Sequence, residues 1–349
     1  MQSVFKYALN DIELDNINAF CETADYCSIE QVPGWAKLYP TTKFCFFYVF
    51  NETGIKSYAQ IIENHRFAQI NFGPVCTDKN VMIYSIKEII EYYKKKNFIF
   101  LGIQLFYKSG YDTDYIEYKL NNLYKIKYIF DNWNTKSSIE IDLNDDIEYI
   151  FRHFSKGHKS DIKKAQKLGI YIEELDSLPD LHVFNDLFTK MCNARHIDRG
   201  ELRSDAIFDI YNLLNTQNRG KILLAKDTEQ KIIGGVILVS QGVSLRYFKG
   251  ASDPDLRHLP VTHLLIFEAI KYAKMQGFKY FDFWGFNHFA DMQDNIYNVN
   301  HFKKGFGGYY TFLAKKMNIS LIPFGFLIYK TSMLMKQKMV KFNFLKIKR

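Results

Sequence analysis

The sequence predicts an α/β protein built from two halves of similar size. Segments typical of strands alternate with segments typical of amphipathic helices throughout the 349 residues, a pattern that favours sheets covered by helices. Hydrophobic residues make up 47% and aromatic residues 17% of the chain, which is enough apolar material for substantial cores. Because the second half repeats the theme of the first, we interpret the chain as a duplicated module.

The first half contains three runs typical of strands and one run with helical spacing. The strands are expected at residues 44–50, 98–106 and 138–143, and the helix at 81–95. The last strand gives way to Asn144, Asp145 and Asp146, so we place a domain boundary near residue 145. The expected division is a first domain at 1–145, a second at 146–318 and a basic amphipathic tail at 319–349.

The second half begins with a basic amphipathic helix at residues 155–168, closed by Gly169. Further helices are expected at 181–195 and 261–276, and strands at 170–173, 221–225, 232–240, 245–250 and 279–284. The interval 190–221 lacks sustained heptads, so we expect no coiled-coil arm.

The charge and cysteine content narrow the class of protein. The net charge is +8, with 46 basic and 38 acidic residues, which favours polyanionic partners such as nucleic acid, sugar nucleotides or an anionic membrane. The five cysteines have no CxxC spacing and the histidines no metal-ligand spacing, so we expect neither a disulfide framework nor a metal site. The N-terminus has no signal-peptide pattern and no run is long enough to span a bilayer, which predicts a cytoplasmic protein.

The run Phe-Lys-Lys-Gly-Phe-Gly-Gly at residues 302–308 is the strongest candidate for a functional site. It places two ammonium groups beside a flexible backbone that a ligand can approach closely. Such a lysine can stabilise an anionic intermediate. The alternative interpretation is a hairpin with a solvated lysine.

Several segments together resemble the FemABX family, the aminoacyl-tRNA-dependent transferases that build peptidoglycan interpeptide bridges. The basic helix and the strand after it match a lysine- and arginine-rich helix of the family, and the closing Phe-Lys-x-Gly-Phe-Gly matches its signature. The other matching segments lie in the family's order at residues 32–37, 70–75, 138–143, 247–252 and 281–285.

The resemblance implies two tandem GNAT-like acyltransferase domains with mixed sheets and no cofactor. It implies transfer of an amino acid from aminoacyl-tRNA to an amine of a peptidoglycan precursor, either nucleotide-linked or lipid-linked. The family's Phe-Lys pair falls on Phe302 and Lys303, which we expect to position and bind the oxyanion or the terminal tRNA phosphate, with Lys304 as the alternative lysine. No general base was assignable, because Asp282 is expected to face a strand partner.

Other site residues follow from the same resemblance. Lys37 matches a lysine that contacts the precursor's phosphates, and either Arg199 or Arg195 matches an arginine with the same task. Two strand aromatics either stack on a base or sugar or belong to the core: Tyr247 and Trp284. The helix lysines expected to hold tRNA are Lys156, Lys159 and Lys163.

Two other functions remain open at this point. An acyl-CoA-dependent N-acyltransferase acting on a sugar amine would have the same fold, although the turn at residues 255–261 lacks the glycines that usually cradle the pyrophosphate. A basic, aromatic-rich module could also bind RNA or cell-wall polymer without turnover. The tail at 330–349 carries lysines among apolar residues, so it either lies on an anionic membrane or packs on the second domain.

Overall fold

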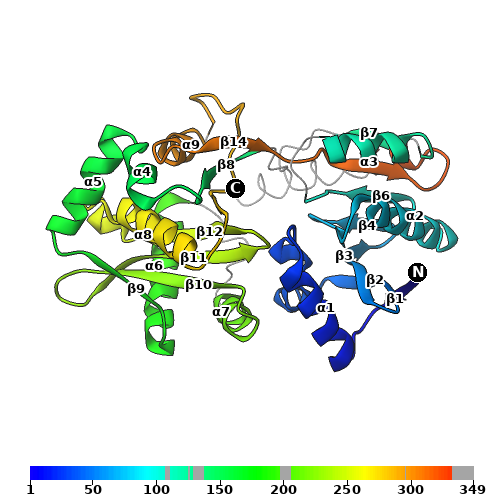
Figure 1. Cartoon of the computed structure of the whole chain (residues 1–349), viewed down its shortest axis with the longest axis horizontal. Coiled ribbons are helices and arrows are strands. Elements are labelled where there is room, and N and C mark those ends of the chain that lie inside the picture. Colours follow the sequence, from blue (N-terminus) through cyan, green and yellow to red (C-terminus); the bar gives the residue numbers. More distant parts are fainter. Residues whose placement is uncertain (107–110, 125, 129–136, 197–205, 295, 332–349) are drawn as a thin grey trace, which may run out of the picture. The chain divides into compact units, whose positions relative to one another are not determined.

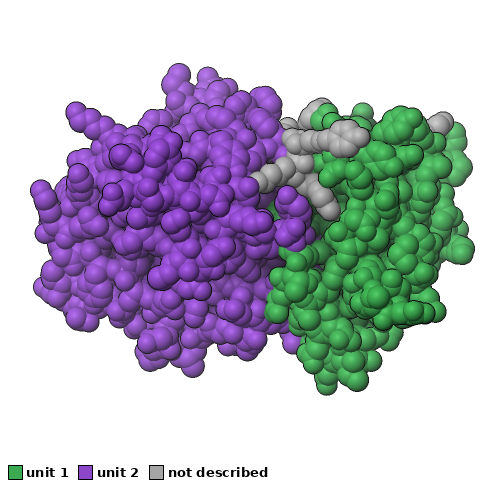
Figure 2. Space-filling view, viewed as in Figure 1, with its two compact units in different colours: residues 1–24, 40–134, 314–349 green, residues 25–39, 135–313 purple. Residues whose placement is uncertain are grey.

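The computed structural model describes residues 1–106, 111–124, 126–128, 137–196, 206–294 and 296–331. The chain forms two compact units, each of which takes segments from distant parts of the sequence (Figure 2). Unit 1 contains residues 1–24, 40–134 and 314–349, and unit 2 contains residues 25–39 and 135–313.

Unit 1 is built on a mixed sheet in the order β1-β2-β3-β4-β6-β15-β7, with β5 paired to β3. β4 and β6 run parallel, and the other pairs are antiparallel. The strands are β1 (Gln2–Lys6), β2 (Lys43–Asn51), β3 (Gly54–Asn64), β4 (Phe67–Ile70), β5 (Val75–Cys76), β6 (Phe100–Ile103), β7 (Ile126–Tyr128) and β15 (Met317–Ser320).

The helices of unit 1 are α1 (Asp11–Thr23), α2 (Lys79–Lys95) and α3 (Tyr111–Asn121). α2 begins where the side chain of Asp78 accepts hydrogen bonds from two backbone N–H groups of the first turn. Its apolar face, including Ile86 and Ile90, packs with strand residues such as Phe47 and Ile61 to form the core of this unit.

Strand β15 ties the end of the described chain into unit 1. It lies between β6 and β7, and its Met317 and Ile319 are buried in the core. Further on, the ring of Tyr329 stacks on Phe100 with 4.0 Å between centroids. Residues 319–329, which we had expected to begin a separate tail, are therefore part of the unit 1 fold up to this contact, whereas residues 332–349 lie outside the described part.

Unit 2 is built on a second mixed sheet, in the order β14-β8-β13-β12-β11-β10-β9. β12 and β13 run parallel, and the other pairs are antiparallel. The strands are β8 (Ser137–Asp142), β9 (Tyr171–Glu174), β10 (Gly220–Lys226), β11 (Ile232–Gln241), β12 (Ser244–Ser252), β13 (Tyr280–Asp282) and β14 (Tyr309–Phe312).

The helices of unit 2 cover this sheet, and α8 lies along α5 (Figure 1). The α-helices are α4 (Ile147–Arg152), α5 (Lys156–Lys167), α6 (Leu178–Arg195), α7 (Ala206–Thr216), α8 (Val261–Met275) and α9 (Tyr297–Lys304), and the short 3-10 helices are η1 (Ile29–Gln31), η2 (Pro33–Leu38) and η3 (Pro254–Leu256). Ile162 and Ala165 of α5 pack with Phe281 and Phe283 in the core of this unit.

The parallel strands of unit 2 separate where the candidate residues lie. Residues 244–246 of β12 pair with residues 280–282 of β13. β12 then continues along β11 as far as Ser252, whereas the chain turns away after β13. The predicted strand at 279–284 is therefore too long, because Trp284 already belongs to the turn.

Candidate functional site

The predicted lysine lies on α9, close to this separation of the strands. Lys303 is 5% exposed, and its ammonium donates hydrogen bonds to the backbone carbonyls of Trp284 and Gly285, the second at 3.0 Å. An ammonium has three N–H groups, so these contacts leave one for a ligand. The alternative interpretation of a hairpin with a solvated lysine was wrong, since the residue is helical and buried.

The turn that Lys303 binds has an unusual backbone. Trp284 and Gly285 have φ values of +45° and +51°, and the left-handed region is unfavourable for a residue with a side chain. Asp282 accepts a hydrogen bond from the Trp284 N–H at 2.8 Å, and its carboxylate also accepts from the hydroxyl of Ser138 on β8. Asp282 thus faces a strand partner, as predicted. The turn is held by Asp282 through its N–H group and by Lys303 through its two carbonyls.

Burial changes the acidity of Lys303. Removal from water lowers the pKa of Lys303 to about 8, with the Asp282 carboxylate opposing the shift and the positive charge of Lys249 adding to it. At pH 7 roughly one tenth of such a group is neutral. The charged form can stabilise an oxyanion, and the neutral form can accept a proton from an attacking amine. The sequence had not indicated that Lys303 could accept a proton.

A buried arginine lies on the other side of the turn. Arg246 is fully buried, and its guanidinium donates to both carboxylate oxygens of Glu30 at 3.0 Å and to the hydroxyl of Ser28 at 3.1 Å. It also donates to Gln241. The guanidinium carbon lies 4.2 Å from the ring centroid of Trp284, so the same cation supports the side chain whose backbone Lys303 binds.

The Glu30–Arg246 pair was missed by the sequence analysis. Burial raises the pKa of Glu30, but the charge of Arg246 and its hydrogen bonds outweigh that effect and hold the pKa below its usual value. The one signal in the sequence was the presence of two charged residues, Arg246 and Lys249, inside the predicted strand at 245–250. Its partner lies 216 positions away, and no local pattern relates the two.

A histidine of the basic helix forms a hydrogen bond with the Phe-Lys-x-Gly-Phe-Gly motif at residues 302–307, which together with Gly308 we call the signature motif. The Nε2–H of His158 donates to the carbonyl of Phe302 at 2.8 Å, and its Nδ1 accepts from the hydroxyl of Ser155 at 2.9 Å. The ring lies so close to Gly305 that an added Cβ there would be 2.0 Å from a ring carbon. The glycine of the motif is therefore required by the packing of His158.

The two glycines that end the motif turn the chain into β14. Gly307 and Gly308 have φ values of +75° and +84°, which favour glycine. A Cβ on Gly308 would lie 2.4 Å from the carbonyl oxygen of Glu140 on β8. These positions allow β14 to pair closely with β8, so this part of the motif has a structural task.

The other predicted residues of this region are distributed around Lys303. Lys304 is exposed, with its ammonium 5.7 Å from the ring of Phe286 and 5.9 Å from that of Tyr310. Tyr247 is half-buried and packs against the core of unit 2. Burial raises the pKa of Tyr247 to about 12, and the positive charge of Arg195 opposes the rise, which places Arg195 near it.

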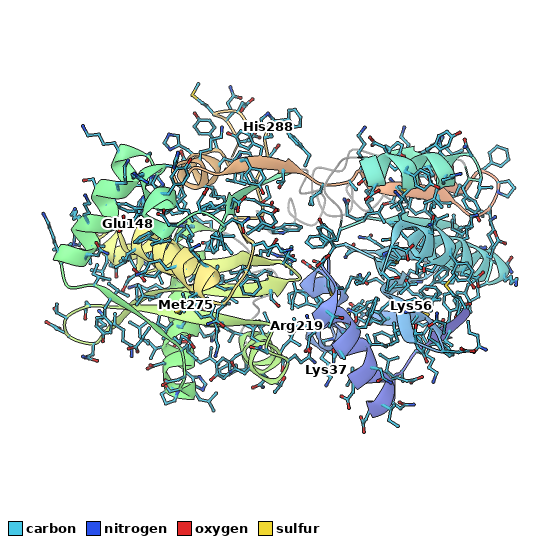
Figure 3. The ribbon with its side chains drawn as sticks, in the orientation of Figure 1. Lys37, Lys56, Glu148, Arg219, Met275 and His288 are labelled. Carbon is cyan, nitrogen blue, oxygen red and sulfur yellow. The ribbon has the colours of Figure 1, made fainter. Side chains whose placement is uncertain are left out.

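The predicted phosphate-binding residues lie on separate elements. Lys37 is exposed on η2, which packs against α7, and it is labelled in Figure 3. Arg195 is exposed at the end of α6. Arg199 lies outside the described residues. The structure thus brings Phe302, Lys303 and Trp284 together, but it joins neither Lys37 nor Arg195 to them by a direct contact among the described atoms.

The basic helix has the predicted two-faced character. His158, Ile162 and Ala165 are buried, whereas Lys156 and Lys163 are exposed and Lys159 is half-buried. The ammonium of Lys159 reaches back to the carbonyl of Arg152 at 2.9 Å, so part of the basic face is used within the helix region. Lys164 also donates to the carbonyl of His258 at 3.3 Å, whereas Lys156 and Lys163 are exposed to solvent.

Metal and membrane motifs are absent from the described part of the chain. His, Cys, Asp and Glu side chains do not gather there in groups of three or more that could hold a metal ion. Among the same residues, every helix is too short or too polar to cross a bilayer.

Comparisons with known proteins agree with the predicted fold. Residues 152–303 match the family model described as an acetyltransferase (GNAT) domain. The crystal structure of FemX superimposes with a TM-score of 0.77 at 15% sequence identity, covering 94% of this chain and 100% of FemX. The prediction of two GNAT-like domains with mixed sheets is confirmed.

Two curated relatives are named Lipid II:glycine glycyltransferase. The chain is 32% identical over 95 residues to the protein from Staphylococcus haemolyticus and 30% identical over 156 residues to that from Staphylococcus epidermidis. These segments cover 27% and 42% of the chain. They cover 22% and 37% of the relatives, so the chain matches well under half the length of those proteins.

Proposed function

We propose that this chain, a member of the FemABX family, is an aminoacyltransferase that moves an amino acid from aminoacyl-tRNA to an amine of a peptidoglycan precursor. The observation that carries the proposal is the environment of Lys303, which is buried and has one N–H group that the two backbone carbonyls do not use. This lysine lies at the position of the family's Phe-Lys signature, and the chain has the fold of FemX. The names of the two glycyltransferase relatives support lipid II or a related precursor as the acceptor.

The reaction is an aminolysis of an ester. The acceptor amine attacks the ester carbonyl, a C–N bond forms, and the bond between the carbonyl carbon and the ribose oxygen breaks after a tetrahedral oxyanion. We assign Lys303 to that oxyanion, because a preorganised donor in a site shielded from water is worth far more than one in solvent. Phe302 positions it through its carbonyl contact with His158. The proton lost by the amine leaves with the ribose hydroxyl.

Substrate binding is assigned to the basic and aromatic residues that the family resemblance selects. We assign the acceptor's phosphates to Lys37 and to Arg195 or Arg199, and the tRNA backbone to Lys156, Lys159 and Lys163. Lys304 is a further candidate for the terminal phosphate. Tyr247 and Trp284 follow the last paired residues of β12 and β13, and we assign them to stacking on a base or sugar.

A peripheral membrane location is a separate part of the proposal. Residues 330–349 carry lysines among Met, Leu and Phe, and each lysine near an anionic surface contributes about 1 kcal/mol. A lipid-linked acceptor would then lie in the same plane. Deletion of residues 332–349, which keeps the Tyr329 contact, should abolish co-sedimentation with anionic vesicles and leave the melting curve unchanged. Vesicle binding by the truncated protein would contradict this part.

The second candidate is an acyl-CoA-dependent N-acyltransferase, which the description of the matching GNAT domain model favours. In such enzymes the pyrophosphate meets free backbone N–H groups at a glycine-rich turn before a helix. Here α8 follows residues 255–260, a turn without glycine, and begins after Pro260, which offers no side-chain cap. We therefore favour the tRNA donor.

A transfer assay with two radiolabelled donors distinguishes these functions. The protein is incubated with a peptidoglycan precursor and either charged tRNA or acetyl-CoA. We expect label in the acceptor from charged tRNA, and loss of that label when the donor is treated with ribonuclease. Transfer from acetyl-CoA instead would establish the second candidate. Consumption of neither donor with any amine would contradict both and favour a binding module.

A further inference from the structure

A row of aromatic side chains lies on the surface beside the candidate site. Tyr310 and Phe312 alternate along β14 and so project from the same face of the sheet. The ring of His288, on the loop between β13 and α9 (Figure 3), lies 5.0 Å from Tyr310 and 5.5 Å from Phe312. Phe289 continues the row at 5.4 Å from His288. We call these four residues the aromatic row.

The aromatic row is exposed to an extent that packing alone does not explain. Phe289 is 71% exposed, and Tyr310 and Phe312 are 44% and 38% exposed. On the other face of the same strand, Thr311 is buried. Contiguous exposed apolar rings on a soluble surface commonly mark an interaction site. β14 is also an edge strand of its sheet, so a ligand can reach the row along its length.

Positive charge borders the aromatic row. The ammonium of Lys304 lies 5.9 Å from the ring of Tyr310, and Phe286 stacks beneath Tyr310 at 5.4 Å. The next residue, Gly305, accepts a hydrogen bond at 2.8 Å from the N–H of Ser155, the residue that caps α5. The N-terminus of the basic helix therefore lies beside the residue that follows Lys304.

We propose that the aromatic row binds the unpaired end of an RNA, whose bases stack on its rings while Lys304 and the first turn of α5 contact the phosphates. Proteins that hold single-stranded nucleic acid combine aromatic platforms with a cationic track in this way. A neutral glycan would also stack on rings but would gain nothing from the adjacent cations. The inference deepens the proposed function, on which it rests, by giving the donor tRNA a site for its single-stranded end.

Binding of a short RNA to the full-length protein tests this proposal. The probe is a fluorescently labelled single-stranded RNA ending in cytidine-cytidine-adenosine, and the control is the same RNA paired to its complement. We expect tighter binding of the single strand, measured by fluorescence anisotropy. Equal affinity for the two forms would overturn the proposal, because paired bases cannot stack on the row.

Substitutions separate stacking from simple apolar contact. Tyr310→Leu and Phe312→Leu keep an apolar side chain but remove the ring, and each should raise the Kd for the single strand by roughly 5- to 100-fold, the effect of losing one stacked base. Tyr310→Phe keeps the ring and should bind normally. Tyr118→Leu, at a 63% exposed tyrosine on α3, is the matched control and should also bind normally. Lys304→Gln should flatten the salt dependence by about one phosphate contact.

The outcomes distinguish this proposal from the proposed function. Unchanged RNA affinity in both leucine variants overturns the aromatic row as an RNA site, even if aminoacyl transfer proceeds. If these variants lose binding to anionic vesicles but keep their RNA affinity, the row is a membrane contact, and the proposal of an RNA site is overturned. Weakened RNA binding without any transfer from charged tRNA supports the row and contradicts the proposed function instead. Melting curves confirm that each variant is folded.

Discussion

At the scale of single residues, Arg246 is a fully buried cation of unit 2 that pairs with Glu30. Arg246→Met should destabilise the protein by about 3–5 kcal/mol, because it leaves the largely desolvated Glu30 carboxylate, with a side chain 17% exposed, without its partner. Adding Glu30→Gln removes that uncompensated charge, so the double variant should be less destabilised than the sum of the single changes. Urea unfolding of the four proteins measures the coupling. Strict additivity would contradict the account.

Lys303 has a structural task and, in the proposed function, a chemical one as well. Lys303→Met should lower turnover by roughly two to three orders of magnitude through the lost oxyanion donor. It should also destabilise the fold by about 1–3 kcal/mol, since the Trp284 and Gly285 carbonyls lose their partner. The stability control is Lys304→Met, which should change the unfolding free energy by less than about 0.5 kcal/mol.

A pair of histidines, His158 and His263, should make stability depend on pH. Burial lowers the pKa of His263 to about 4, and the pKa of its neighbour His158 is also lowered by burial, while Asp161 opposes both shifts. Between pH 6.5 and 4 the unfolded chain therefore binds protons that the folded chain does not. Stability should be fully present above about pH 6.5 and fall as the pH decreases towards 4.

The measurement for the pair is urea unfolding at a series of pH values. His263→Gln should flatten the decline, because its side chain cannot take up a proton in either state. A wild-type curve without a decline in this range, or a variant that loses stability as steeply as the wild type, would contradict the assignment.

At the scale of elements, the signature motif connects α9 to β14 and contacts His158 of α5. Gly305→Ala should destabilise the protein by about 1–3 kcal/mol, since the new methyl group would overlap the ring of His158. Gly157→Ala is the matched control on α5, where an added Cβ meets nothing within 4 Å, and it should be neutral or slightly stabilising. Thermal unfolding compares the two. Equal effects would mean that Gly305 is not constrained by His158.

Helices and strands with a clear period were predictable from the sequence. The helices predicted at 81–95, 181–195 and 261–276 are confirmed as α2, α6 and α8, because their apolar spacing is sustained over several turns. α9 was not predicted, since eight residues of mixed polarity give little periodic signal. The sequence predicted a strand at Trp284 instead of the observed turn. Its left-handed backbone is held by Asp282, two residues before it, and by Lys303, which lies 19 positions away and outside any local pattern.

At the scale of the whole molecule, the sequence predicted two similar α/β halves and a family, but not how the chain is shared between them. Residues 25–39 belong to unit 2, and β15 belongs to unit 1. Each of these two segments joins its unit through contacts with residues far away in the sequence. Glu30 pairs with Arg246, and β15 pairs with β6. Composition and periodicity carry no information on such pairings, whereas the order of the family's short motifs did carry the fold.

The most direct test of the central claim is mass spectrometry of the acceptor after incubation with the full-length protein and a pool of aminoacylated tRNA. The account predicts that a peptidoglycan precursor gains one aminoacyl residue in amide linkage on its free amine, and that Lys303→Met, if folded by its melting curve, forms this product far more slowly. An unmodified precursor in the presence of charged tRNA, together with acylation of an amine from acetyl-CoA, would contradict it.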